Sequence, residues 1–130
     1  MHIKGIGIDI VEIGRIKKIY NLYPQKFRTR IFTQEELSYC DRKSNPFPHL
    51  AVRFAAKEAV AKALGSGIRG ISWKEIEVKK GEKGEVNINL GENARRLAEN
   101  LGINKIMLSL SHSREYAVAQ AIALNGGDKD

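Results

Sequence analysis

Residues 50–64 read Leu-Ala-Val-Arg-Phe-Ala-Ala-Lys-Glu-Ala-Val-Ala-Lys-Ala-Leu, the strongest helix pattern in the sequence. Alanine has the highest helix propensity, and Gly65 directly after this stretch is typical of a helix end. The helix is apolar around most of its circumference, so we expect it to be largely buried. Its charged side chains must then have partners, because an isolated buried charge is costly.

This helix has four charged residues, Arg53, Lys57, Glu58 and Lys62. Arg53 and Lys57 are four residues apart on one face and have the same sign, which is mildly destabilising unless an anion binds beside them. Glu58 and Lys62 have the spacing and order of a helical salt bridge. A solvated charged face is the ordinary interpretation of such a pattern. The apolar surroundings instead predict buried charges that need partners, and a bound polyanion would remove the repulsion between Arg53 and Lys57.

Residues 5–12 read Gly-Ile-Gly-Ile-Asp-Ile-Val-Glu, in which isoleucines alternate with small or acidic residues. Period two predicts a strand with an isoleucine face and a nearly bare face. Asp9 lies on the bare face, where we expect room for a ligand or an ion, although an exposed aspartate at a strand end fits equally well. If Asp9 and Glu58 meet, their hard oxygen atoms suit Mg²⁺ completed by waters and substrate phosphates.

The remaining pattern predicts an α+β fold, a mostly antiparallel sheet packed with helices, with residues 1–130 as a single domain. We expect helices at residues 13–30 with a break at Pro24, at 33–40 behind a capping box, and at 92–101. We expect a loop at residues 44–49 and strands at 71–80, 86–90, 106–111 and 116–124.

Composition limits the classes of function. The net charge of +7 attracts anions, whether nucleic acid, acidic membranes, nucleotide phosphates or an acidic protein. No apolar run approaches the roughly 20 residues of a membrane span, and the N-terminus lacks the apolar core of a signal peptide. The single cysteine, Cys40, allows no internal disulfide and fits a reducing compartment. We therefore expect a cytoplasmic protein with no membrane partner.

Two further segments carry candidate binding residues. Ser111-His112-Ser113-Arg114 ends one strand and begins a tight turn, and its side chains suit phosphate or ribose contacts, although a polar hairpin turn is as good an explanation. Residues 65–70, Gly-Ser-Gly-Ile-Arg-Gly, have the spacing of a dinucleotide fingerprint but follow a helix and not a strand. We interpret them as a helix end and a flexible loop that approaches a ligand.

Four motifs together resemble holo-acyl-carrier-protein synthase, a family of 4'-phosphopantetheinyl transferases. They occur in the order and spacing of that family over nearly the whole chain, at residues 5–16, 32–36, 53–63 and 108–119. One departure is Gly84-Glu85-Val86, where the family commonly has Gly-x-Pro. This difference affects the rigidity of a turn more than the chemistry.

The resemblance implies transfer of the 4'-phosphopantetheine group of coenzyme A to a serine of apo acyl carrier protein, with release of adenosine 3',5'-bisphosphate, in fatty acid biosynthesis. Asp9 and Glu58 match the Mg²⁺ ligands of the family, and Lys62 would act on the leaving group. The residues that match positions near the nucleotide and phosphates are Arg53, Lys57, Lys62, Gly65, Gly67, Ser111 and His112. The group that takes the serine proton stays open between Glu58 and a water on the metal.

The resemblance also implies partners. Arg15 matches a basic position on the helix that receives the acidic carrier protein, and Lys18 and Arg28 extend this patch. Small members of the family are typically homotrimers with sites between protomers, so His112 would serve a neighbouring site.

Two other classes of function remain. A small nucleic-acid-binding protein would explain the charge of +7 but not Asp9 and Glu58, which repel phosphate, and the sequence lacks a nucleic-acid motif. We therefore expect no nucleic-acid partner. A non-catalytic binder of coenzyme A or nucleotides would keep the basic residues but has no need for paired carboxylates.

Overall fold

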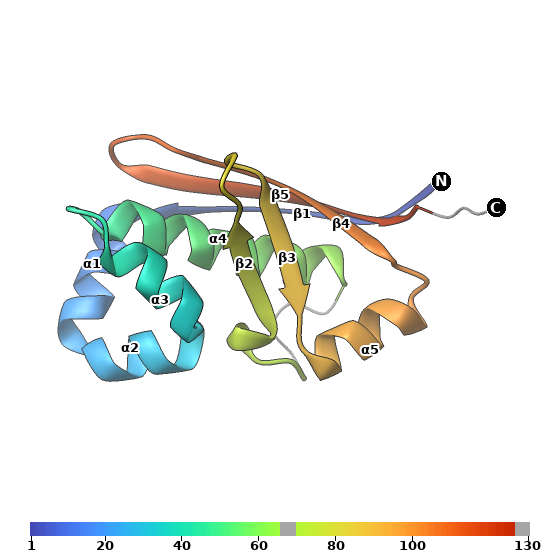
Figure 1. Ribbon diagram of the computed structural model, residues 1–130, viewed down its shortest axis with the longest axis horizontal. Coiled ribbons are helices and arrows are strands. Elements are labelled where there is room, and N and C mark those ends of the chain that lie inside the picture. Colours follow the sequence, from blue (N-terminus) through green and yellow to red (C-terminus); the bar gives the residue numbers. More distant parts are fainter. Residues whose placement is uncertain (66–69, 127–130) are drawn as a thin grey trace.

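Helix α4 (Phe47–Ala63) lies along one face of a three-stranded antiparallel sheet, and the other elements are arranged around this pair (Figure 1). The sheet has the order β1-β5-β4, with β1 (His2–Glu12) at one edge, β5 (Tyr116–Asn125) in the centre and β4 (Lys105–His112) at the other edge. This arrangement confirms the predicted α+β class with an antiparallel sheet.

The computed structural model describes residues 1–65 and 70–126. A second antiparallel sheet is formed by β2 (Ile76–Lys80) and β3 (Val86–Leu90), and β2 contacts α4. The remaining elements are α1 (Ile13–Leu22), α2 (Pro24–Ile31), α3 (Gln34–Asp41), the 3-10 helix η1 (Trp73–Glu75) and α5 (Glu92–Asn100). Within the two described ranges, no helix has both the length and the apolar character needed to cross a membrane.

Small side chains let α4 approach the sheet closely. A Cβ atom on Gly5 would overlap the carbonyl oxygen of Ala63, and one on Gly7 would overlap that of Ala59. Opposite them, the inward face of β5 carries fully buried alanines at alternate positions. The bare face of β1 is therefore the buried face. The backbone of α4 fills the space beside Gly5 and Gly7, and a cavity opens where the strand reaches Asp9, the position at which the sequence predicted room for a ligand or an ion.

The isoleucine face of β1 points outward. Ile6, Ile8 and Ile10 are each between 61% and 66% exposed. Ile6 pairs with Ile122 of β5, and Ile10 pairs with Val118, so the apolar surface continues onto the central strand. Exposed apolar patches of this kind mark contact surfaces more often than isolated exposed side chains do.

The boundaries of several elements follow from local chemistry. Pro24 is the first residue of α2, which confirms the predicted break. The Thr33–Glu36 capping box is also present. The predicted loop at residues 44–49 was too long, because α4 begins at Phe47. Pro48 is tolerated in the first turn, where its missing N–H would have no acceptor within the helix.

The strand predicted from residue 71 was also too long. Trp73–Glu75 form a 3-10 turn, and β2 begins only at Ile76. Ile76 and Val78 lie on the buried face, as their spacing predicted. Helix α5 ends at Asn100, and Gly102 follows with a φ of 74°, which confirms the predicted helix end.

Candidate active site

The fold brings Asp9 and Glu58 together. Asp9 projects from β1 and Glu58 from α4, and both line a cavity of about 550 Å³ between the strand, helix α1 and α4. The Lys62 ammonium, one turn after Glu58, donates to Asp9 Oδ1 at 3.2 Å and to the Ile8 carbonyl at 2.9 Å. The three residues predicted for catalysis thus occupy one site at the junction of β1 and α4.

Electrostatics in this cavity favour a cation. Burial raises the pKa of Glu58, the negative charge of Asp9 raises it further, and the nearby Lys62 lowers it. Among the described residues, no cluster of three or more His, Cys, Asp or Glu side chains is arranged to hold a metal. Two carboxylates are nevertheless the donor set with which Mg²⁺ is commonly held when substrate phosphates and waters complete its shell. Asp9 and Glu58 therefore fit the ion.

A second, cationic cavity of about 200 Å³ lies elsewhere on α4, lined by Arg53, His49, Lys80, Ser111 and His112 among others. The Arg53 side chain is 3% exposed, and its Nη1 donates to the His49 carbonyl at 3.2 Å. Its Nε has no hydrogen-bond partner among the described residues. A buried N–H without an acceptor beside other cations is what a bound anion would satisfy.

The pKa shifts around this second cavity agree with a surplus of positive charge. Burial and then the charges of Lys43 and Arg53 lower the pKa of His49. For Tyr39, burial alone would raise the pKa, but Lys80, Lys43 and Arg53 outweigh it and lower the value. The Arg53 guanidinium also lies 4.2 Å from the centroid of the Tyr39 ring.

The two cavities face different sides of α4. Arg53 and Glu58 are five residues apart, which corresponds to about 140° around a helix. The residues that line one cavity are separate from those that line the other. The acid pair and the cationic cavity of one chain therefore do not form one continuous pocket.

Lys57, which was predicted to lie near the nucleotide, is completely buried. Its ammonium forms an ion pair with Glu36 at 2.8 Å and donates to the Ile76 and Trp73 carbonyls at 2.7 and 3.1 Å. Burial lowers the pKa of Lys57, and Glu36 opposes that shift. All three ammonium hydrogens have acceptors in the protein, so Lys57 has none left for the phosphate contact that the sequence predicted.

The residues predicted for carrier binding separate into two groups. Arg15 and Lys18 are exposed on α1. Arg15 lines the cavity that contains Asp9 and Glu58, called here the acid cavity. Arg28 instead forms a bidentate pair with Asp41 at 3.0 and 2.8 Å and donates to the Tyr20 hydroxyl at 3.1 Å. The hydrogen bond to Asp41 raises the pKa of Arg28. Arg28 is therefore already engaged within the protein.

The glycines after α4 are partly described. Gly65 has a φ of 84°, a left-handed conformation that favours glycine at a helix end. Gly67, also predicted to lie near the nucleotide, falls outside the described residues. The aromatic residues Phe54 and Trp73, next to the acid cavity, were missed, because their proximity depends on a contact between segments distant in sequence.

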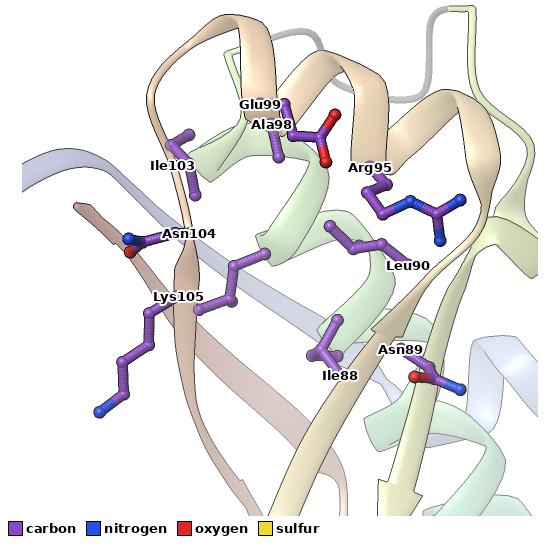
Figure 2. Close-up of a pocket in the computed structure, with 10 residues that line it drawn as sticks. Ile88, Asn89, Leu90, Arg95, Ala98, Glu99, Ile103, Asn104 and Lys105 are labelled. Atoms are coloured by element: carbon purple, nitrogen blue, oxygen red, sulfur yellow. The ribbon is translucent and has the colours of Figure 1, made fainter. Parts of the chain in front are cut away.

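A third cavity, of about 410 Å³, lies between β3, α5 and the start of β4 (Figure 2). Ile88, Leu90 and Ala98 form much of its apolar wall, and Arg95 lies at its edge. None of the residues singled out by the sequence lines it. It offers neither an acid pair nor a cluster of cations, so it does not compete with the two cavities on α4.

Paired carboxylates beside a lysine, together with a separate cationic cavity, are typical of the class of proteins that bind a phosphorylated ligand. Comparison with known proteins gives the family. The sequence model described as "4'-phosphopantetheinyl transferase superfamily" matches residues 5–121. The chain belongs to this superfamily, which confirms the resemblance found in the motifs.

Individual relatives agree with this assignment. The chain is 52% identical over 120 residues to a holo-[acyl-carrier-protein] synthase of Chlamydia trachomatis, an alignment that covers 92% of this chain and 98% of that protein. The crystal structure of holo-[acyl-carrier-protein] synthase from Neisseria meningitidis has a TM-score of 0.88 and 38% identity, covering 95% of this chain and 99% of that one. The Helicobacter pylori synthase in complex with coenzyme A has a TM-score of 0.81 and 32% identity, with 92% and 99% coverage.

Proposed function

We propose that this protein is a holo-[acyl-carrier-protein] synthase. It transfers the 4'-phosphopantetheine group of coenzyme A to a serine of apo acyl carrier protein, releases adenosine 3',5'-bisphosphate, and serves fatty acid biosynthesis in the cytoplasm. The observation that carries the proposal is the meeting of Asp9 and Glu58 in one cavity, with Lys62 paired to Asp9, in a chain that matches the family over almost its whole length. The names of the relatives, and coenzyme A in one related structure, support the same substrate.

Asp9 and Glu58 would hold Mg²⁺. When bound, the ion would offset the negative charge of the pyrophosphate and of the leaving group. Burial and then the charge of Asp9 raise the pKa of Glu58, and a cation between the two carboxylates would relieve their mutual repulsion.

The chain's own side chains supply the rest of the chemistry. The serine oxygen forms a bond to the β-phosphorus while the bond from that phosphorus to the bridging oxygen breaks, and the bisphosphate leaves with the electron pair. The Lys62 side chain is half exposed and ends beside Asp9, so its Nζ can donate to this leaving oxygen. Glu58 lines the same cavity, and its carboxylate would accept the serine proton.

Arg53, Ser111 and His112 would bind the nucleotide end of coenzyme A through its phosphates. Their cavity faces a different side of α4 from Asp9 and Glu58. Within one chain, the nucleotide-binding residues and the carboxylate pair therefore do not line the same cavity. We propose a homotrimer in which the cationic cavity of one protomer adjoins the acid pair of its neighbour. The exposed row of Ile6, Ile8 and Ile10 supplies an apolar surface that such an assembly would cover.

The acidic carrier protein would bind along α1. Arg15 lies at the mouth of the acid cavity, and Lys18 is exposed one turn further along the helix. A docked carrier would thereby place its serine close to Asp9 and Glu58. Arg28 contributes less to this surface, because its guanidinium is held by Asp41.

Chromatographic analysis of the released nucleotide tests the proposal. Incubation with coenzyme A, Mg²⁺ and an apo carrier protein should release adenosine 3',5'-bisphosphate in a one-to-one ratio with modified carrier. A carrier whose acceptor serine is replaced by alanine should give none. Release of the bisphosphate at the same rate with the alanine carrier would show hydrolysis of coenzyme A and contradict the transfer.

A further inference from the structure

The ring of Phe54 forms part of the wall of the cavity that contains Asp9 and Glu58. Phe54 is one turn before Glu58 on α4, so its ring lies on the same side of the helix as that carboxylate. A side chain in this place has to stay fixed, because a displacement of about 1 Å among reacting groups can cost about 100-fold in rate.

Trp73 holds this ring from outside the cavity. The indole of Trp73 stacks on the Phe54 ring with a centroid distance of 4.9 Å and an interplanar angle of 21°. Phe27 also packs on Phe54, at 6.4 Å and 28°. The Trp73 contact is the closer of the two and joins η1 to α4 through two residues that are 19 positions apart in the sequence.

The backbone of Trp73 is anchored to the same helix. Its carbonyl accepts a hydrogen bond from Lys57 Nζ at 3.1 Å, and Lys57 is itself fixed by its buried ion pair with Glu36. Lys57 lies between Phe54 and Glu58 in the sequence. Both the ring of Trp73 and its main chain are therefore fixed to the turn of α4 that carries Glu58.

Trp73 also borders open space. Its indole lines a neighbouring cavity of about 490 Å³ together with Ile19, Tyr23 and Lys26. Removing the indole would enlarge that open space and take away the nearer of the two rings that stack on Phe54. Trp73 is not among the residues that line the acid cavity, and Phe54 is the lining residue on which its indole stacks.

We infer that Trp73 is a positioning residue for phosphopantetheine transfer, which holds the Phe54 ring against the cavity where the reacting groups meet. This inference rests on the proposed function. Trp73 lies outside the cavity and would affect the rate through the Phe54 ring. The buried Lys57 contacts would contribute to the same effect, because they fix the main chain of Trp73.

A double-mutant cycle tests the inference. Trp73→Leu should lower kcat about tenfold while KM for coenzyme A changes less than about twofold, and Trp73→Phe, which keeps a stacked ring, should stay within about twofold of wild type. Phe54→Leu should lower kcat to a similar extent. In the Phe54→Leu background, adding Trp73→Leu should change kcat by less than about twofold, because the residue on which Trp73 acts is gone.

Rates are to be compared at a temperature where circular dichroism shows each variant fully folded. Ile88→Ala serves as the control, since it creates space on β3 in the separate cavity of Figure 2 and should leave kcat unchanged. An equal loss of kcat from Trp73→Leu in both backgrounds would overturn the inference. If the wild-type protein does not transfer phosphopantetheine, both the proposed function and this inference are wrong. If the wild-type protein is active but the two substitutions lower kcat independently, only this inference is wrong.

Discussion

The Lys62 ammonium lies 3.2 Å from Asp9 Oδ1 and thereby joins α4 to β1 at the acid pair. The carboxylates of Asp9 and Glu58 and the ammonium of Lys62 thus lie where α4 crosses β1. The Lys62 ammonium therefore lies beside the position where negative charge would develop on the leaving group.

Replacing Lys62 by Met should lower kcat by about 100-fold, the size expected when a group that donates a proton or stabilises the leaving oxygen is lost. The pKa of Glu58 should also rise, because Lys62 is the cation that lowers it. Steady-state kinetics and NMR titration of a labelled Glu58 measure the two effects. Lys105→Met, at the rim of the cavity in Figure 2, is the control, and equal kinetics of the two variants would exclude the role of Lys62.

The buried ion pair of Lys57 should affect the free energy of unfolding. Replacing Lys57 by Met leaves Glu36 buried without its cation, which should lower the free energy of unfolding by about 3–5 kcal/mol. Replacing both residues with apolar ones should recover part of this loss. Urea unfolding followed by circular dichroism measures it. A Lys57→Met protein with wild-type stability but weakened affinity for coenzyme A would instead support the direct contact predicted from the sequence.

Arg53 should act on ligand affinity. Its buried Nε has no acceptor among the described residues, so a bound phosphate would gain a charge-assisted hydrogen bond. Arg53→Gln should weaken binding of coenzyme A by about tenfold in calorimetric titration. Arg42→Gln is the matched control, since Arg42 also lies over the Tyr39 ring but does not line the cationic cavity. Equal affinities of the two variants would remove Arg53 from the binding site.

Glu75 should give the fold a dependence on pH. Its carboxylate accepts hydrogen bonds from the N–H groups of Asn93 and Ala94 at the start of α5. Burial would raise the pKa of Glu75, but hydrogen bonds from the Ser72, Ala94 and Asn93 backbone lower it. The charged form is thus favoured in the folded state, so this stabilisation is present above the ordinary pKa of glutamate and is lost as pH falls through the lowered value.

Glu75→Gln should therefore cost about 1 kcal/mol near neutral pH, the usual value of a lost helix cap, and almost nothing in acid. Thermal unfolding of both proteins at pH 7 and pH 3 measures the difference. A cost that stays constant across this range would mean that the carboxylate charge is not what caps α5.

Much of this account could be predicted from local pattern. Period two and period 3.6 drew attention to Asp9 on a strand and to the charges of one helix, while the roles of Asp9, Glu58 and Lys62 followed from the resemblance of the motifs to a known family. The partners of Lys57 could not be found in this way. Glu36 and Trp73 lie 21 and 16 residues from it in the sequence, and no local pattern records that tertiary contact.

The orientation of β1 was also beyond local pattern. An isoleucine face opposite a glycine face suggests that the isoleucines are buried or that the glycines leave free space. The structure instead packs the glycines against the alanines of α4 and leaves the isoleucines exposed. Only knowledge of which helix approaches the strand decides between these outcomes.

The central claim is metal-assisted transfer at the Asp9–Glu58 pair, and the intact mass of an apo acyl carrier protein tests it most directly. After incubation with this protein, coenzyme A and Mg²⁺, the carrier should gain about 340 Da, the mass of the phosphopantetheine group. The gain should disappear with EDTA and should require at least about tenfold more Mg²⁺ when Glu58 is replaced by Gln. A carrier whose mass stays unchanged with folded wild-type enzyme, or a gain that persists in EDTA, would contradict the account.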